Sequence, residues 1–242
     1  MMGHITVVGG CRAKVPLTGI LASTLSVGST VKLIENGAAV EYLVVNQGIP
    51  ENSSLYDTSC DGTWLLRKDV HSDRQWNTRY NTYENSLINT WLNKDFFDSL
   101  GVIDKSAVKY VKIPYGVGNN TSTVNSGANG LGVKAFLLGF YECGWTTADS
   151  SIFLVDGAKL TYFEAGTGAA ANNKRIAYLN GTADYWFTRC PNLGNTAQLC
   201  MVSQNGSIDN FNAQYSRGIR PAMIITGNAI FDETTMLLKG VA

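Results

Sequence analysis

Few side chains in this sequence of 242 residues could carry out chemistry. Its two histidines are His4, near the beginning, and His71, in the polar stretch KDVHSDRQWN. A Ser-His-Asp or Cys-His site would need one of them as its general base. Neither the GxSxG elbow of hydrolases nor the HExxH motif of metalloproteases occurs. Carboxylate pairs such as Asp95 and Asp98 could serve a glycosidase only if the fold sets the right distance between them, and the sequence does not give that distance. We therefore expect a protein that is not an enzyme.

The cysteines do not form a metal-binding pattern. No CxxC pair occurs and no histidine lies near a cysteine, whereas structural zinc sites need such clusters. An odd number of cysteines without a visible secretion signal predicts reduced thiols. Cys190 and Cys200 flank a predicted loop, so their pairing stays open. The five cysteines are Cys11, Cys60, Cys143, Cys190 and Cys200.

We expect no resident cofactor, and calcium is the alternative left open. Four aspartates, Asp57, Asp61, Asp69 and Asp73, lie close together in the sequence. Their carboxylates, together with carbonyl oxygens of Asn-rich loops, are ligands that Ca²⁺ accepts. EF-hand spacing is absent, however, and aspartates of this kind commonly make Asx turns.

Charge and composition exclude two classes of partner. Lys and Arg together number 19, as do Asp and Glu, so the net charge is zero and nucleic acid is an unexpected partner. No apolar run is long enough to span a bilayer, so no membrane insertion is expected. The first 25 residues carry Arg12 and Lys14 and lack the apolar core of a signal peptide. The abundance of Asn, Gly and Tyr suits both adaptable recognition loops and a turn-rich β protein.

Two hairpins and several strands are predicted. Asn36-Gly37 lies between two β-rich runs in residues 31–45, and Asn205-Gly206 lies between two more in residues 198–211. Both dipeptides favour the tight turns of hairpins, because Asn and Gly tolerate positive φ. Residues 63–67 and 134–138 are typical of short buried strands.

A helix is predicted from Asn81, because Asn81 and Glu84 have capping-box spacing and apolar residues recur on one face after them. A weaker helix is expected over residues 104–111, and loops over residues 116–132 and 166–173. Strands followed by a helix or two indicate an α+β class. Residues 1–26 look like an arm for docking or oligomerisation, with a simple first strand as the alternative. Residues 27–226 then form the domain and 227–242 a C-terminal extension.

Taken together, several segments resemble a family of lectin-like domains from gut Gram-positive bacteria and their prophages. The resemblance covers roughly residues 27–225, and it departs from the family pattern at WFTRCP, where Thr188 and Cys190 replace the usual Leu and Ser. The matching segments are VEYLVVNQG, SLYDTSCDGTWLLRKD, VKIPY, NSGANGL, FLLGFYECGWT, DGAKLTYF, NNKRIAYLNGTADYWFTRCP and SRGIRPAMII.

The resemblance implies a C-type-lectin-like fold related to the formylglycine-generating-enzyme scaffold, with short strands, one or two helices and long irregular loops. The motifs of calcium-dependent sugar binding are absent, and only Cys190 and Cys200 could stand for the copper-binding cysteines of that enzyme. In relatives the ligand surface lies in the stretch before the GxRPA segment. In this sequence that stretch is residues 192–215. The ligand-binding residues that the resemblance suggests are Asn192, Asn195, Gln198, Asp209, Asn210, Asn212, Gln214, Tyr215 and Arg217.

The expected function is a non-enzymatic binding module at the tail tip, baseplate or fibre of a phage virion. Its partners would be other virion proteins and a host-surface glycan or protein, and it would be assembled in the host cytoplasm as a homo-oligomer. A structural virion protein, such as a capsid decoration or tail-assembly component, is the alternative, and an enzyme of the formylglycine-generating type is a third. Arg189 and Arg220 are expected to anchor the core, whereas Trp76 and Trp145 lie among polar neighbours and are expected to be exposed.

Overall fold

The computed structural model describes residues 17–51 and 54–242, and its regular structure is dominated by strands. Strands account for 36% of the described residues and helices for 16%, and the longest α-helix among them has 7 residues. The expected α+β class, with its C-type-lectin-like organisation, is therefore wrong, and the fold is β-rich with little helix. Many of its strands, such as β7 (Tyr115–Gly116), are too short to show an alternating pattern in the sequence.

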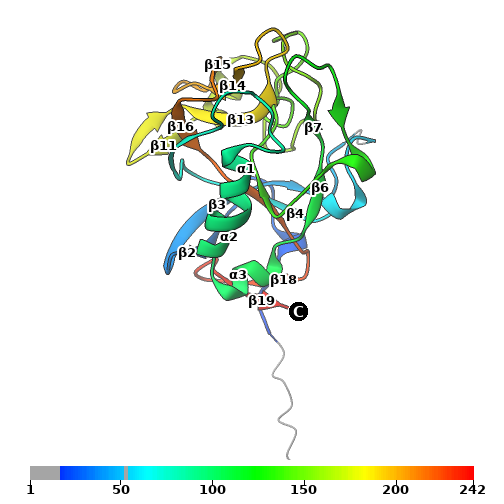
Figure 1. Cartoon of the computed structure of the whole chain (residues 1–242). Helices are drawn as coiled ribbons and strands as arrows, with labels where there is room; N and C mark the ends of the chain where they lie inside the picture. The colour runs from blue at the N-terminus through cyan, green and yellow to red at the C-terminus, as the bar shows by residue number, and fades with distance from the viewer. Residues whose placement is uncertain (1–16, 52–53) are drawn as a thin grey trace, which may run out of the picture.

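The first large sheet lies in the half of the molecule that holds the C-terminus (Figure 1). Its strands are all antiparallel. The predicted hairpin is confirmed, because β2 and β3 are joined by Asn36 and Gly37 with φ values of 48° and 82°. In spatial order the strands are β10 (Ala135–Phe136), β17 (Ala222–Ile225), β4 (Thr63–Arg67), β3 (Ala38–Gln47) and β2 (Thr30–Glu35).

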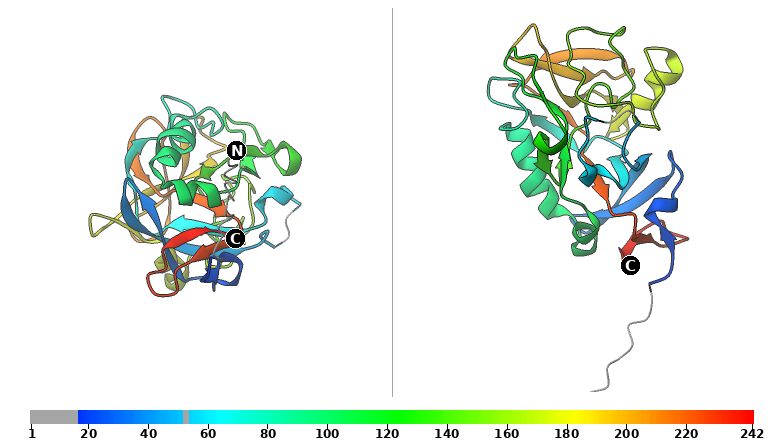
Figure 2. Two further views of the ribbon diagram at one scale, coloured as in Figure 1. Left: turned by 90° about the horizontal axis from the view of Figure 1, so that it is seen from below. Right: turned by 90° about the vertical axis from the view of Figure 1, so that its right-hand side faces the viewer.

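The second large sheet lies at the opposite end of the molecule (Figures 1 and 2). The predicted hairpin around residues 205–206 is confirmed as β14 and β15, and β13 pairs in parallel with β16 at Trp186 and Gly218. In spatial order the strands are β15 (Ile208–Asn212), β14 (Gln198–Val202), β13 (Trp186–Pro191), β16 (Ser216–Ile219) and β5 (Ser72–Gln75).

Smaller sheets complete the β-structure. A three-stranded sheet joins β1, from the predicted N-terminal arm, to β18 and β19 of the predicted C-terminal extension. Residues 1–16 of the arm lie outside the described residues, so the docking role of the arm stays a prediction. The bounds are β1 (Ile20–Leu21), β18 (Ala229–Phe231), β19 (Leu238–Val241), β6 (Val111–Ile113) paired with β9 (Leu131–Val133), β7 paired with β8 (Val124–Asn125), and β11 (Ala177–Leu179) paired with β12 (Thr182–Asp184).

The helices are short, and two expectations about them are wrong. The predicted helix begins at Ser86 rather than at Asn81, because the Ser86 side chain accepts a hydrogen bond from the backbone N–H of Asn89. The chain that was expected to be a loop over residues 166–173 contains α4 (Ala169–Arg175). The other helical segments are α1 (Leu87–Trp91), the π-helical turn η3 (Leu92–Phe96), α2 (Phe97–Ser99), α3 (Val102–Ala107) and the 3-10 turns η1 (Ala22–Thr24), η2 (Thr58–Cys60) and η4 (Gly127–Asn129). Among the described residues, no helix has both the length and the apolar character needed to cross a membrane.

Four fully buried tryptophans, Trp64, Trp76, Trp145 and Trp186, mark the core between and beside the two large sheets. The expectation that Trp76 and Trp145 are exposed is wrong. Trp76 donates to the backbone carbonyl of Thr188 at 3.2 Å, and Trp145 stacks on the Phe140 ring, with ring centres 5.1 Å apart. The polarity of their immediate sequence neighbours does not show these contacts, which include Thr188 for Trp76 and Arg175 for Trp145.

Candidate functional site

The hairpin of β14 and β15 carries most of the residues that the sequence suggested for ligand contact. β15 is an edge strand of its sheet and pairs with β14, so that Asn212 lies opposite Gln198 and Asn210 lies opposite Cys200. Figures 1 and 2 show this hairpin at the end of the molecule farthest from the C-terminus. The surface is therefore presented away from the β1–β18–β19 sheet.

Three of the suggested residues hold the loop that leads into β14. Asn192 is buried, and its side-chain oxygen accepts a hydrogen bond from Gly194 N–H at 2.8 Å. The Asn195 oxygen accepts from Ala197 N–H at 2.9 Å, and Gln198 accepts a longer bond of 3.4 Å from the Asn192 amide. The hydrogen-bonding groups of these side chains are thus used to shape the loop.

Asn81, which was not among the predicted site residues, holds the same loop from the interior of the protein. Asn81 is fully buried, and its amide nitrogen donates to the backbone carbonyls of Asn192, Asn195 and Gln198 at 3.0, 3.0 and 2.7 Å. Its side-chain oxygen accepts from the backbone N–H of Asn119 at 2.8 Å. A position that was expected to cap a helix instead satisfies the backbone of two loops.

An aromatic and cationic cluster lies at the end of β15. The Phe211 and Tyr215 rings are 5.5 Å apart, and the Arg217 guanidinium lies 4.0 Å from the centre of the Phe211 ring. The same guanidinium lies 5.7 Å from the Tyr185 ring centre, and its one hydrogen bond to a described residue goes to the Ser216 carbonyl at 3.0 Å. Tyr215 is 50% exposed. The rings hold Arg217 in place while most of its donors stay available.

The remaining suggested residues are polar and largely uncommitted. The side chains of Asn210, Asn212 and Gln214 make no hydrogen bond with any described residue, and Asn210 and Gln214 are exposed. Asp209 accepts from the Asn210 backbone N–H at 2.7 Å and borders a cavity of about 330 Å³ that Tyr185 also lines. Amide, carboxylate and aromatic groups therefore meet on one surface, which suits polar recognition of a ligand.

A buried ion pair between Arg189 and Glu142 anchors β13, a central strand of the sheet that carries the candidate surface. Arg189 on β13 is fully buried and makes a two-armed contact with Glu142, with N–O distances of 2.6 and 2.7 Å. It also donates to the carbonyls of Pro114 and Leu137, both at 2.9 Å. Tyr56 donates to Glu142 at 2.8 Å. The prediction that Arg189 anchors the core is confirmed.

The prediction for Arg220 is confirmed as well. Its guanidinium donates to the backbone carbonyls of Arg67 and Lys68, both at 2.8 Å, and lies 5.2 Å from the Trp186 ring centre. Burial lowers the pKa of Arg220 to about 10. Arg220 therefore joins the end of β4 to the start of β17 and to β13.

The cysteines next to this core are reduced and unsuited to metal binding. Cys190 and Cys200 are free thiols, which answers the open question of their pairing. Cys190 donates to the Asp156 carboxylate at 2.8 Å and accepts from Phe140 N–H at 3.0 Å. Burial raises the pKa of both thiols well above the usual range. Because metals bind the thiolate, these positions do not fit the copper role.

The stability of the protein is expected to depend on the protonation of Asp156. Burial raises the pKa of this carboxyl from 3.8 to about 6, despite the nearby Arg189. The folded protein therefore favours the protonated acid, and this stabilisation is complete below pH 3.8 and lost as the pH rises through about 6. Asp156→Asn, which mimics the neutral acid, should be more stable than wild type at pH 8 and equal to it near pH 4. Urea unfolding at both pH values checks this, and an equal difference at both would contradict it.

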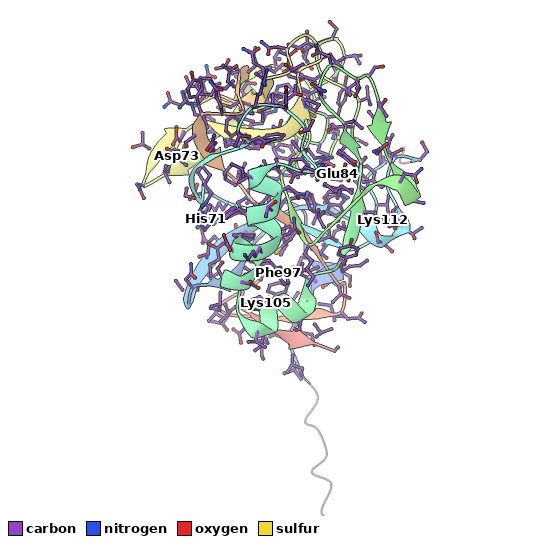
Figure 3. All side chains as sticks on the ribbon, viewed as in Figure 1. His71, Asp73, Glu84, Phe97, Lys105 and Lys112 are labelled. Carbon is purple, nitrogen blue, oxygen red and sulfur yellow. The ribbon has the colours of Figure 1, made fainter. Side chains whose placement is uncertain are left out.

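The other chemical candidates are separate from one another. Asp57 caps a short helical turn by accepting from Ser59 N–H at 2.8 Å, and Asp73 lies on β5. No group of three or more His, Cys, Asp or Glu in residues 17–51 and 54–242 could hold a metal ion. His71 packs edge-on against Trp91, with ring centres 5.1 Å apart, and burial lowers its pKa. Figure 3 places His71 beside the helical run and below Asp73.

Comparison with known proteins gives one match. No curated protein and no solved structure matches the chain. A family model described as "Domain of unknown function (DUF6273)" matches residues 61–227, from just before β4 to just after β17. The match includes every strand of the sheet that carries the candidate surface. Since it spans more than half of the sequence, the chain belongs to the DUF6273 family.

Proposed function

We propose that this chain is a non-enzymatic binding module of a phage virion, which recognises a host-surface glycan or protein through the β14–β15 surface. The binding surface consists of Asp209, Asn210, Asn212, Gln214, Tyr215 and Arg217, with the Phe211 ring beneath them. The loop residues Asn192, Asn195 and Gln198 shape this surface from its edge.

One observation carries the proposal: polar side chains that make no hydrogen bond with the described residues gather around the Phe211 and Tyr215 rings at one edge of a sheet. Asn210, Asn212 and Gln214 make no side-chain hydrogen bond with the described residues, and Tyr215 is half exposed. Tyr offers rigid contact area and Asn offers adaptable hydrogen bonding, as in other recognition surfaces. Arg189 and Glu142 hold the strand behind it in place.

The virion context is supported by the resemblance of the sequence to domains from gut Gram-positive bacteria and their prophages. A surface of this kind binds weakly at a single site, and display in several copies would raise the overall affinity. The surface lies at the end farthest from the C-terminus, so attachment through the β1–β18–β19 end leaves it free (Figure 2).

Removing the uncommitted side chains tests the site. The variant with Asn210, Asn212 and Tyr215 all replaced by Ala is expected to lose at least nine-tenths of its binding to host cells, because side chains at the centre of an interface carry most of the affinity. Its melting temperature should stay close to that of wild type, since none of these side chains holds the fold. Binding of a fluorescently labelled protein to cells measures the effect.

The control is Tyr110→Ala, which removes a 62% exposed tyrosine between α3 and β6, away from the hairpin. This variant should bind as wild type does. Unchanged binding by the triple variant would refute the site, and equal loss in both variants would refute its location.

A second function, that of a structural virion protein, is favoured by a different observation. Exposed apolar side chains gather at the end of the molecule formed by β1, β19 and α3, where Val102 is 82% exposed and Ile103 48% exposed. Leu17 and Val241 are 43% and 41% exposed at the same end. Buried contact with a neighbouring virion protein would cover these groups.

Immunogold electron microscopy on phage particles distinguishes the two functions. Label at the tail tip, baseplate or fibre is expected for a receptor-binding module. Label over the capsid would favour the structural role, and intact particles without label would contradict both.

A further inference from the structure

Two arginines face each other next to the binding surface. In the antiparallel pairing of β16 with β5, Arg217 lies directly opposite Arg74. Residues in such a pair point to the same face of the sheet, with their Cβ atoms roughly 4.5–5.5 Å apart. Side chains of like charge at directly opposite positions destabilise a strand pair, so the arrangement is unfavourable unless something else compensates for it.

No carboxylate of the described residues forms an ion pair with either arginine, although the charge of Arg217 partly offsets the rise that burial causes in the pKa of Asp73. Neither arginine takes part in an ion pair, whereas Arg67 pairs with Glu35 and Arg189 pairs with Glu142. The Arg74 side chain makes no hydrogen bond with any described residue, and its buried Nε atom has no partner. Arg217 has one bond, to a backbone carbonyl.

Aromatic rings hold both guanidinium groups in place. Arg74 lies 3.9 Å from the centre of the Trp91 ring on α1, and Arg217 lies 4.0 Å from that of Phe211 on β15. Stacking of this kind fixes the orientation of the guanidinium without neutralising it. The unpaired donors are therefore preorganised for a ligand.

A hollow lies beside Arg74. A cavity of about 360 Å³ is bordered by Arg74, Gln75, Leu87, Trp91 and Ser216, which places it between β5, the start of α1 and the residue before Arg217. Asp73 also borders this cavity, but neighbouring residues of a strand point to opposite faces, and Asp73 forms no ion pair with Arg74. Figure 3 shows Asp73 at the rim of the molecule.

We infer that Arg74, Arg217 and the cavity between β5 and α1 form a subsite for an oxyanionic group, a carboxylate or a phosphate, of a host-surface glycan. Guanidinium groups bind such oxygens through charge-assisted hydrogen bonds. The anion would satisfy the free donors and remove the repulsion between the two arginines. This inference rests on the proposed binding function and specifies the chemical class of its ligand.

An array of neutral, carboxylated and phosphorylated glycans tests the subsite, with wild type compared to Arg74→Gln and Arg217→Gln. Wild type is expected to prefer an anionic class, and each variant to lose about tenfold in affinity for it, which corresponds to about 1.4 kcal/mol. The class of glycan that wild type binds, carboxylated or phosphorylated, identifies the anionic group that the subsite recognises. Binding should weaken at 0.5 M NaCl because salt screens charge.

The control is Arg79→Gln, since Arg79 is also stacked on a ring, at 4.9 Å from Tyr80, but is exposed, whereas Arg74 and Arg217 are partly buried. It should bind as wild type does. The Arg74 and Arg217 variants should melt at the same temperature as wild type or higher, because one of two repelling charges is gone.

Two outcomes would overturn the subsite. If wild type binds neutral glycans equally well, or if both Gln variants bind anionic glycans as wild type does, the subsite is wrong while the proposed function stands, provided that the triple Ala variant still loses cell binding. If wild type binds neither glycans nor cells, both proposals fail.

Discussion

Replacing Glu142 by Gln is expected to lower the free energy of unfolding by about 3–5 kcal/mol, because it leaves the charge of Arg189 buried and unpaired. Both side chains are fully buried, and the pair is joined by two short contacts of 2.6 and 2.7 Å. The next carboxylate, Asp156, lies 3.8 Å from Arg189 Nε and does not replace the two-armed contact. Urea unfolding followed by tryptophan fluorescence measures the loss.

Glu41→Gln is the matched control, because it breaks an ion pair of similar length in an exposed position. Glu41 and Lys68 are 2.7 Å apart, with side chains about 45% and 44% exposed. Exposed pairs contribute at most about 1 kcal/mol. If Glu142→Gln cost no more than Glu41→Gln, the view that Arg189 is held by charge pairing would be wrong.

The sequence predicted those parts of the fold that depend on neighbouring residues. Asn36-Gly37 adopts positive φ at both positions and joins two strands, and residues 63–67 form β4 with the predicted bounds. The turn at Asn205-Gly206 also joins two strands as expected. In each case a few adjacent side chains determine the backbone, so a short stretch contains the information.

The wrong predictions reflect a local helix propensity that was missed and packing partners that lie outside the immediate sequence neighbourhood. The run GTGAAANN was expected to be a loop, but three alanines favour the helix α4, and Arg175 at its end is fixed by the carbonyls of Cys143 and Gly166 at 2.7 and 2.6 Å. Trp145 is buried by Phe140 and by Arg175, whose guanidinium lies 4.3 Å from its ring. The polarity of sequence neighbours carries no information about these partners.

The sequence predicted the stretch that contains the candidate site, but it did not predict which residues of that stretch shape the loop and which have free side chains. Residues 192–215 contain β14, β15 and the loop before them, and the Arg217 guanidinium packs on Phe211 of this stretch. Only the structure separates the residues that shape the loop from those that stay free. Arg74 was not singled out, since its position opposite Arg217 depends on the pairing of β5 with β16. No local pattern in the sequence predicts that register.

Replacing Asn81 by Ala is expected to lower the free energy of unfolding by about 2–4 kcal/mol. The change removes all the hydrogen bonds of a fully buried amide, and the Asn119 N–H and the Asn192 carbonyl are left without partners at roughly 1–3 kcal/mol each. The loss is expected to be local as well as global. Amide exchange should accelerate over residues 118–121 and 192–198 and stay unchanged in the β2–β3 hairpin.

The control is Asn77→Ala, because the Asn77 side chain also bonds to the backbone, donating to the Tyr80 carbonyl at 3.0 Å, but in an exposed setting. It should cost less than about 1 kcal/mol, since water replaces the lost bonds. Equal losses in the two variants would show that the loop holds its shape without Asn81.

The reason to expect a large effect at Asn81 lies in the backbone around it. Loop 192–198 has few partners in a sheet, so its buried carbonyls need side-chain donors. Asn81 supplies them from a point so crowded that a Cβ on Gly118, where φ is 81°, would come within 2.6 Å of the Asn81 carbonyl oxygen. Part of the abundance of Asn in this sequence therefore serves the interior of irregular loops. Cell binding by Asn81→Ala should fall less than in the triple Ala variant, because Asn81 acts on the binding surface only through the loop that enters β14.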